Sequence, residues 1–211
     1  MITSLLSTES PELYIFLVLI ISISILLCYY TTAVVFCIIL LFLLYFYRHE
    51  ETTKRYPDNY IVSPAYGKVT NIIHTASHTY ISIFLSPLDV HTQIYPVNGR
   101  VIKRIYDTTG IFGLATDIDK CRNNEKKIHY IQMTNGYILK LTQIAGFLPR
   151  RISSDDTINT NVEAGEYLGI IKFGSRVDIL YPHVITDNNV FNLQVKVGDV
   201  VTHDSIIGWY D

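Results

Sequence analysis

The feature that most constrains this chain is a run of 35 residues, 13–47, without a single charged side chain. One helix of that length would measure about 52 Å at ~1.5 Å per residue, whereas the hydrocarbon core of a bilayer is about 30 Å thick. We therefore expect either one long helix that continues past the interface, or a helical hairpin that breaks near residues 29–32. Residues 1–47 are predicted to form a membrane anchor, as a transmembrane helix or hairpin.

The residues that flank this run predict which side of the membrane the rest of the chain occupies. Arg48, Lys54 and Arg55 follow the run closely, and no basic residue precedes it. By the positive-inside rule, we expect the C-terminal part to face the cytoplasm. A cleaved signal peptide is the competing interpretation, but the basic n-region is absent and the run is more than twice as long as an h-region.

Composition narrows the class of the remaining chain. Charged residues make up 17% of the sequence, below the ~25% of ordinary soluble domains. The net charge of −2 argues against a nucleic-acid binder that relies on a basic surface. Cys28, Cys37 and Cys121 form neither a disulfide framework nor a CxxC metal site. We expect a linker at 48–59 and one domain at 60–211.

That domain has the sequence pattern of a β fold. Short runs rich in Val, Ile, Thr and Tyr are separated by turn residues about every ten positions. Strands are predicted at residues 68–73, 80–85, 99–105, 127–134, 137–144, 168–173, 177–180 and 190–197. Asn135-Gly136 predicts a hairpin turn, and residues 86–91 could hold a short helical turn. The predicted class is mainly β, a barrel-sandwich-like domain.

A short internal echo indicates two similar entries into the sheet. The segment PAYGKV (64–69) returns 32 residues later as PVNGRV (96–101). Each is a Pro-x-x-Gly turn that leads into a strand. Two such matches do not make a repeat protein, but they predict two equivalent strand starts.

Five motifs, in order along residues 60–211, together resemble the phosphatidylserine decarboxylase family, in particular its short, membrane-anchored form. They are VSPAYGKV (62–69), FLSPLDVH (84–91), the pair NE (124–125), QIAG with RRI (143–146 and 150–152), and GIIKFGSRVD (169–178). The resemblance implies a pyruvoyl-dependent enzyme that converts phosphatidylserine, or the related archaeal serine lipid, to the ethanolamine lipid and carbon dioxide.

The chemistry of that reaction gives Gly174-Ser175 its importance. Decarboxylation of an amino acid leaves electrons on Cα, so the catalyst needs an electron sink that no ordinary side chain supplies. The resemblance implies that Ser175 Oγ attacks the Gly174 carbonyl in an N→O acyl shift. Elimination then frees the β chain of 1–174, and hydrolysis with loss of ammonia converts Ser175 into a pyruvoyl group that caps the α chain of 175–211. Neither a metal nor pyridoxal phosphate is expected.

Three further residues enter as candidates for the site. His91 matches the family histidine associated with decarboxylation, and a neutral imidazole suits a general acid or base. Lys172 and Arg176 flank the bond and could hold phosphate or carboxylate. A regular strand would place both opposite Ser175, which favours a solvated face equally. Asp89 is expected to cap a turn.

Two positions depart from the family pattern. Tyr66 stands where family members carry an Asp that assists self-cleavage, and Ile94 stands where some branches have a second histidine. A phenol near pKa ~10 does not replace an ionised carboxylate. Either another group substitutes, or the chain is a processing-defective, membrane-tethered lipid-binding homologue. The candidates for substitution are His74, His78, Asp89 and His183; a metal site at His74 and His78 is not expected, because no third ligand is recognisable.

Overall fold

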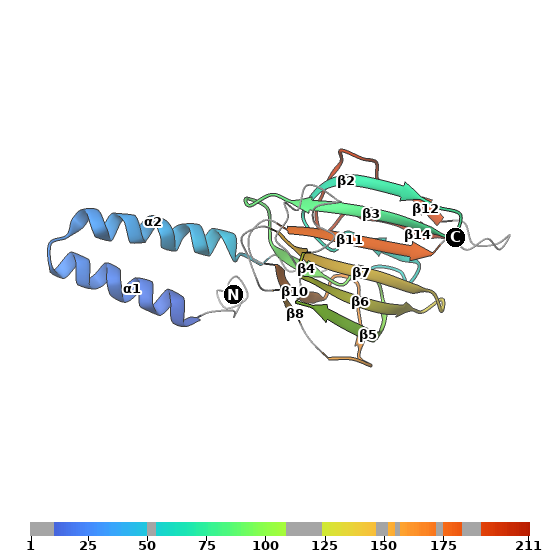
Figure 1. The fold of residues 1–211 in the computed structure, drawn as a ribbon, viewed down its shortest axis with the longest axis horizontal. Coiled ribbons are helices and arrows are strands. Elements are labelled where there is room, and N and C mark those ends of the chain that lie inside the picture. The colour runs from blue at the N-terminus through green and yellow to red at the C-terminus, as the bar shows by residue number, and fades with distance from the viewer. Residues whose placement is uncertain are drawn as a thin grey trace. The chain divides into compact units, whose positions relative to one another are not determined.

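The computed structural model describes residues 11–49, 54–108, 124–146, 152–154, 157–171, 175–182 and 191–211. The chain divides into two compact units, Met1–Glu50 and Glu51–Asp211. The first is helical and the second is built from strands (Figure 1). Each unit is described below by itself.

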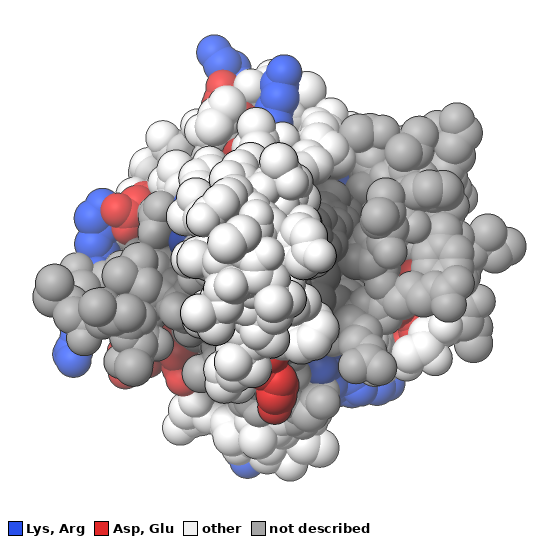
Figure 2. Space-filling view, turned by 90° about the vertical axis from the view of Figure 1, so that its left-hand side faces the viewer, with Lys and Arg blue, Asp and Glu red and all other residues white. Residues whose placement is uncertain are grey.

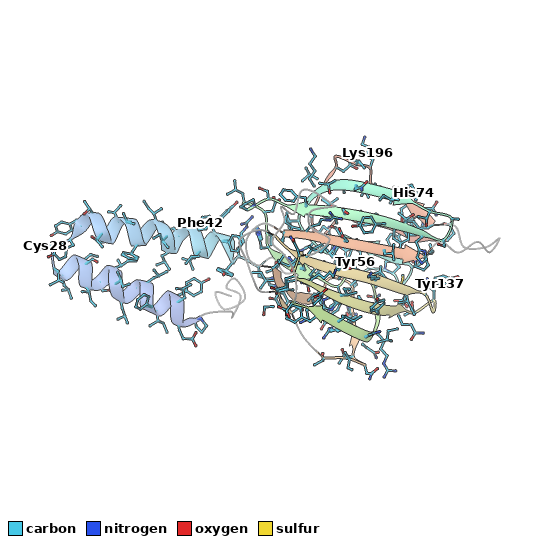
Figure 3. The ribbon with its side chains drawn as sticks, in the orientation of Figure 1. Cys28, Phe42, Tyr56, His74, Tyr137 and Lys196 are labelled. Atoms are coloured by element: carbon cyan, nitrogen blue, oxygen red, sulfur yellow. The ribbon has the colours of Figure 1, made fainter. Side chains whose placement is uncertain are left out.

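The first unit is a hairpin of two apolar helices, α1 (Pro11–Leu26) and α2 (Tyr30–Phe46). The hairpin alternative is therefore the observed one, and the chain turns at residues 27–29, slightly before the predicted break. Cys28 lies at this turn (Figure 3) and has a φ of 59°, the left-handed conformation that commonly ends a helix. Among the described residues, no helix combines the length and the apolar content that a membrane crossing requires.

The helices expose most of their large apolar side chains. Leu26, Tyr30 and Ile38 are each more than 60% exposed, and neither helix has a polar face. Figure 2, which faces the end of the hairpin where α1 meets α2, shows that end covered by uncharged side chains. Such a surface is unusual for a unit that packs only against water.

The second unit confirms the mainly β class. Its strands are β1 (Tyr60–Val62), β2 (Gly67–His74), β3 (His78–Leu85), β4 (Thr92–Ile94), β5 (Gly99–Asp107), β6 (Lys126–Met133), β7 (Ile138–Ala145), β8 (Ile152–Ser154), β9 (Asn161–Val162), β10 (Tyr167–Ile171), β11 (Ser175–Pro182), β12 (Phe191–Leu193), β13 (Val200–Val201) and β14 (Ile206–Tyr210). The predicted strand at 190–197 is shorter, and residues 86–91 form a hydrogen-bonded turn without a helix.

The described strands of this unit form three sheets. The largest has the order β13-β2-β3-β11-β7-β6-β5-β9, and two smaller sheets have the orders β4-β10-β8 and β1-β14-β12. Figure 1 shows β11 between β3 and β7, near the middle of the large sheet. Alternate side chains of the large sheet point into one apolar core that includes Ile83, Leu141 and Val177. The site is built where this core meets the β4-β10-β8 sheet.

The internal echo corresponds to two equivalent strand starts. Gly67 begins β2 and Gly99 begins β5. A Cβ atom on Gly67 would lie 2.2 Å from the carbonyl oxygen of Phe84, and one on Gly99 would lie 2.3 Å from that of Gln132. Both glycines are needed because the neighbouring strand passes too close for any side chain.

Candidate active site

Ser175 is the first residue of β11 and is completely buried. Its neighbours across the ladder are Leu85 of β3 and Ala145 of β7. Its hydroxyl Oγ makes no hydrogen bond to any residue that the structure describes. The serine therefore presents an unengaged, water-shielded hydroxyl at a rigidly held position.

The Gly174-Ser175 bond lies where the chain passes from one sheet to another. Strand β10 ends at Ile171 in the β4-β10-β8 sheet, and β11 begins at Ser175 in the large sheet. Only three residues join them. Lys172 and Gly174, two of the predicted site residues, belong to this link and lie outside the described residues.

The motifs that are distant in the sequence meet around Ser175. The FLSPLDVH segment contains Leu85, one ladder neighbour, and the QIAG segment contains Ala145, the other. The NE pair holds Ala145 from its far side, since Asn124 Nδ2 donates to the Ala145 carbonyl at 2.8 Å and the Ala145 N–H donates to the Glu125 carbonyl at 2.9 Å. The fold thus assembles one site from these motifs.

His91 lies at the same end of the sheet and is completely buried. The segment that carries it leaves β3 beside Ser175, and the Ile171 N–H donates to the His91 carbonyl at 3.3 Å. Its Nδ1 lies 2.8 Å from the carbonyl oxygen of Asp89. Because a carbonyl only accepts, Nδ1 carries a proton, and Nε2 is the ring nitrogen left to exchange one.

Asp89 caps the turn, as predicted. Its carboxylate accepts the Ser86 N–H at 2.7 Å, and its own N–H donates to the Ser86 carbonyl at 2.9 Å. This turn fixes the carbonyl that orients the His91 ring. Asp89 thus engages its carboxylate in the turn and its carbonyl with the His91 ring, and its role as a substitute group stays a prediction.

Arg176 lies on the face opposite Ser175, as strand alternation predicts, but it is buried and not solvated. Its Nε donates to Asp178 Oδ1 at 2.6 Å, and its Nη2 donates to Ser82 Oγ at 2.9 Å and to the Tyr80 hydroxyl. Tyr80 in turn donates to Asp178 Oδ2 at 2.6 Å. These bonds occupy the guanidinium in tying β11 to β3.

The same cluster changes the acidity of Tyr80. Burial is the main cause, and the adjacent Asp178 carboxylate is the second; together they raise the pKa of Tyr80 from 10.0 to about 12. The phenol therefore remains a hydrogen-bond donor to Asp178 well above neutral pH.

Tyr66 and Ile94, the two departures from the family pattern, have different surroundings. Ile94 is buried in an apolar cluster with Val62 and Ala164, so its position holds no titratable group. The ring of Tyr66 meets the ring of His203 edge to face, with centroids 4.7 Å apart. His203 is buried, and its Nε2 lies 3.1 Å from the Thr92 carbonyl, directly after His91.

Two of the candidates for substitution, His74 and His78, lie far from Ser175. His74 and His78 are at the far end of β2 and β3 (His74 is labelled in Figure 3), and His78 pairs with Pro182, whereas Ser175 pairs with Leu85. Seven strand positions correspond to about 23 Å at ~3.3 Å each. These two histidines are therefore wrong as substitutes, because the sheet separates them from the bond. His183 lies outside the described residues.

No group of three metal-binding side chains occurs among the described residues. His74 Nδ1 is within 2.9 Å of the Thr79 hydroxyl, and His78 Nδ1 is within 2.7 Å of the Ser77 hydroxyl.

The sequence analysis missed His203, which no motif contains, and the buried side chains of Gln93 and His129. Gln143, which bonds to both Gln93 and His129, lies within the QIAG motif and was the one sequence feature that pointed to these side chains. Their burial inside a β domain could not be read from spacing alone.

Comparisons with known proteins agree with this geometry. The sequence profile of phosphatidylserine decarboxylase matches residues 39–203. A phosphatidylserine decarboxylase proenzyme of Prosthecochloris aestuarii is 42% identical over 128 residues, 58% of each chain. One of Chlorobium luteolum is 35% identical over 158 residues, 72% of this chain and 73% of the relative. A putative archaetidylserine decarboxylase proenzyme of Methanosarcina mazei is 34% identical over 145 residues, 68% of this chain and 63% of the relative.

The relatives that the chain matches are named as proenzymes of lipid decarboxylases. The chain belongs to the phosphatidylserine decarboxylase family. It spans 58% of the length of the Prosthecochloris relative. No solved structure matches it.

Proposed function

We propose that this chain cuts itself between Gly174 and Ser175 and then decarboxylates phosphatidylserine, or a closely related serine phospholipid. The observation that carries the proposal is the position of Ser175. Its buried hydroxyl, free of hydrogen bonds to described residues, stands at the start of a central strand between two family motifs. Family membership supplies the reaction class.

The surroundings of Ser175 fit the pyruvoyl group that this serine would become. The ladder with Leu85 and Ala145 fixes the backbone on both sides, and burial keeps water from a reactive carbonyl. That group supplies the electron sink for the electrons that carbon dioxide leaves behind.

His91 is the proton-transfer group of this proposal. The Asp89 carbonyl holds its Nδ1–H, so that Nε2 can take or return a proton at the reacting carbon. Arg176 contributes by holding β11 in place, because its guanidinium is bound to Asp178, Tyr80 and Ser82. Because the Arg176 guanidinium is occupied by these bonds, the phosphate of the substrate would need another cation. Lys172 stays a prediction for that role.

The test is the mass of the purified protein together with carbon dioxide release. Wild-type protein should separate under denaturing conditions into two chains of 174 and 37 residues, the smaller with a pyruvoyl end. Ser175→Ala should remain a single chain and release no carbon dioxide. Ser77→Ala is the matched control and should still be cut, because Ser77 is exposed in the turn between β2 and β3, at the end of the sheet away from Ser175. Decarboxylation by uncut Ser175→Ala would refute the proposal.

A second candidate function rests on Tyr66. This residue stands at the position of the family carboxylate and contacts His203. A phenol does not replace an ionised carboxylate as the acceptor of a hydrogen bond from a ring N–H. A chain that fails to cut itself would remain a membrane-tethered lipid-binding protein. Uncut wild-type protein that still binds serine-lipid vesicles is the result that favours this candidate.

We further propose that the helical hairpin attaches the protein to a membrane, with the strand unit on the cytoplasmic side. The support is the exposed, uncharged surface of α1 and α2 and the basic residues that follow it. A lipid substrate stays in the bilayer, so attachment keeps the site close to it.

A further inference from the structure

A chain of polar side chains runs through the otherwise apolar interior of the strand unit. Gln93 of β4, His129 of β6 and Gln143 of β7 are each completely buried, and Arg104 of β5 is partly buried. They come from four strands and from two sheets. Burial of polar groups is unfavourable unless their hydrogen bonds are satisfied. The partners of these four side chains are therefore informative about what they do.

Four hydrogen bonds join these residues in one line. The atom pairs are Arg104 Nε with His129 Nδ1 at 3.1 Å, His129 Nε2 with Gln143 Oε1 at 2.9 Å, Gln143 Nε2 with Gln93 Oε1 at 2.9 Å, and Gln93 Nε2 with the His91 carbonyl oxygen at 2.5 Å. The line therefore ends on the backbone of the residue that the proposed function uses for proton transfer.

Chemistry at the two ends fixes the direction of every bond. A guanidinium only donates, so His129 Nδ1 must accept and its proton must lie on Nε2. A carbonyl only accepts, so Gln93 must donate its amide N–H to His91. All four bonds thus point the same way, from the Arg104 cation to the His91 carbonyl, and aligned bonds of this kind polarise one another.

We propose that Arg104, His129, Gln143 and Gln93 are positioning residues that hold His91 in its working geometry. The inference rests on the proposed function, in which His91 moves the proton. The line anchors the carbonyl of His91, while the Asp89 turn orients its ring. Small displacements of a proton-transfer group from its reacting atom are known to lower rates by up to about 100-fold.

Substitutions that preserve volume separate this role from packing. Gln143→Glu has the same shape, but an ionised carboxylate cannot donate to Gln93. We expect kcat per pyruvoyl group to fall by 10-fold or more, with KM within about twofold. His129→Gln keeps one acceptor and one donor in the same order, and should retain at least about a third of the wild-type kcat. His129→Leu, which can do neither, should lose as much as Gln143→Glu.

Gln132→Glu is the matched control, because it makes the same chemical change at an exposed position of β6, outside the line. It should leave kcat unchanged. The proposal is overturned if Gln143→Glu keeps kcat within twofold of wild type, or if His129→Gln falls as far as His129→Leu. Each rate is divided by the fraction of cut chain from intact mass, so that slow self-cleavage is not read as slow decarboxylation.

A second measurement tests the direction of the hydrogen bonds in the line, and it does not require the chain to decarboxylate. Nitrogen-15 spectra of histidine-labelled full-length protein in detergent should show His129 as the neutral tautomer with the proton on Nε2. A proton on Nδ1, or a charged ring at pH 7.5, would refute the line. Absence of both the cut and carbon dioxide in the wild type would instead refute the proposed function alone.

Discussion

At the scale of single residues, the two faces of β11 have separate tasks. Ser175 faces the core, and its hydroxyl bonds to none of the described residues, while Arg176 and Asp178 face the other way and bind Tyr80 of the adjacent strand. Consecutive residues of one strand thus supply the proposed reactive group and a clamp. The clamp consists of a buried ion pair whose polar atoms are bonded on several sides, the arrangement in which such a pair is tolerated.

The clamp predicts a pH effect that belongs to Tyr80. Its pKa is raised to about 12 in the folded chain, against about 10 when unfolded, so its contribution to stability is complete below pH 10 and disappears as pH rises through 12. We expect the loss to be about 1–2 kcal/mol after allowance for partial exposure. Tyr80→Phe should be less stable at pH 8 but show a shallower decline between pH 10 and 12, measured by urea unfolding.

Tyr130→Phe is the control for that measurement, since this phenol lies on β6, away from the Asp178 carboxylate. It should decline with pH as the wild type does. An unchanged slope in Tyr80→Phe would contradict the raised pKa of Tyr80.

At the scale of elements, the strand starts at Gly67 and Gly99 determine how closely the neighbouring strands approach. Gly67 is packed against the Phe84 carbonyl, and its φ is 150°. The pair of Pro-x-x-Gly turns was visible in the sequence as an echo. The sequence did not show the reason, because the close contact involves the backbone of another strand.

Gly67→Ala should destabilise the strand unit by about 3 kcal/mol or more, because the new methyl group would lie 2.2 Å from a carbonyl oxygen and the strands would have to part. Gly136→Ala should cost only about 1 kcal/mol, since Gly136 has a positive φ but open space around it. Thermal unfolding of both variants checks the difference. Equal losses would show that backbone conformation, and not the close approach, makes glycine necessary at Gly67.

The sequence predicted the elements of the fold better than the neighbours within the site. Strand existence followed from β-branched periodicity, and Ser175 and His91 came from motifs in the family order. His203 and His129 were missed because their importance depends on pairing between strands that are far apart in the sequence. Strand alternation alone predicts correctly that Arg176 lies on the face opposite Ser175. It does not show that this face is buried at Arg176.

At the scale of the whole molecule, an apolar hairpin and a strand unit with a polar interior line are joined in one chain. If the hairpin attaches to lipid, the full-length protein should float with phospholipid vesicles in a density gradient and remain bound in 1 M salt. Lysines at two exposed helix positions, Leu19→Lys and Ile38→Lys, should each oppose insertion by about 2.5–3.5 kcal/mol and release most of the protein.

Thr70→Lys with Gln132→Lys adds the same charge at exposed positions of the strand unit. This control should float like the wild type. Release of wild-type protein by salt alone would show that the attachment is electrostatic and does not depend on the hairpin.

The placement of Gly174-Ser175 between two sheets has a consequence for maturation. Strands β11, β13 and β14 all lie after the bond, and they are hydrogen-bonded to β3, β7, β2 and β1, which lie before it. Cleavage of the backbone there would turn the link between β10 and β11 into two chain ends, while the hydrogen bonds between all of these strands would remain. Maturation of the precursor would then change the covalent connectivity but not the fold. The new N-terminus would form already in its final position in the sheet.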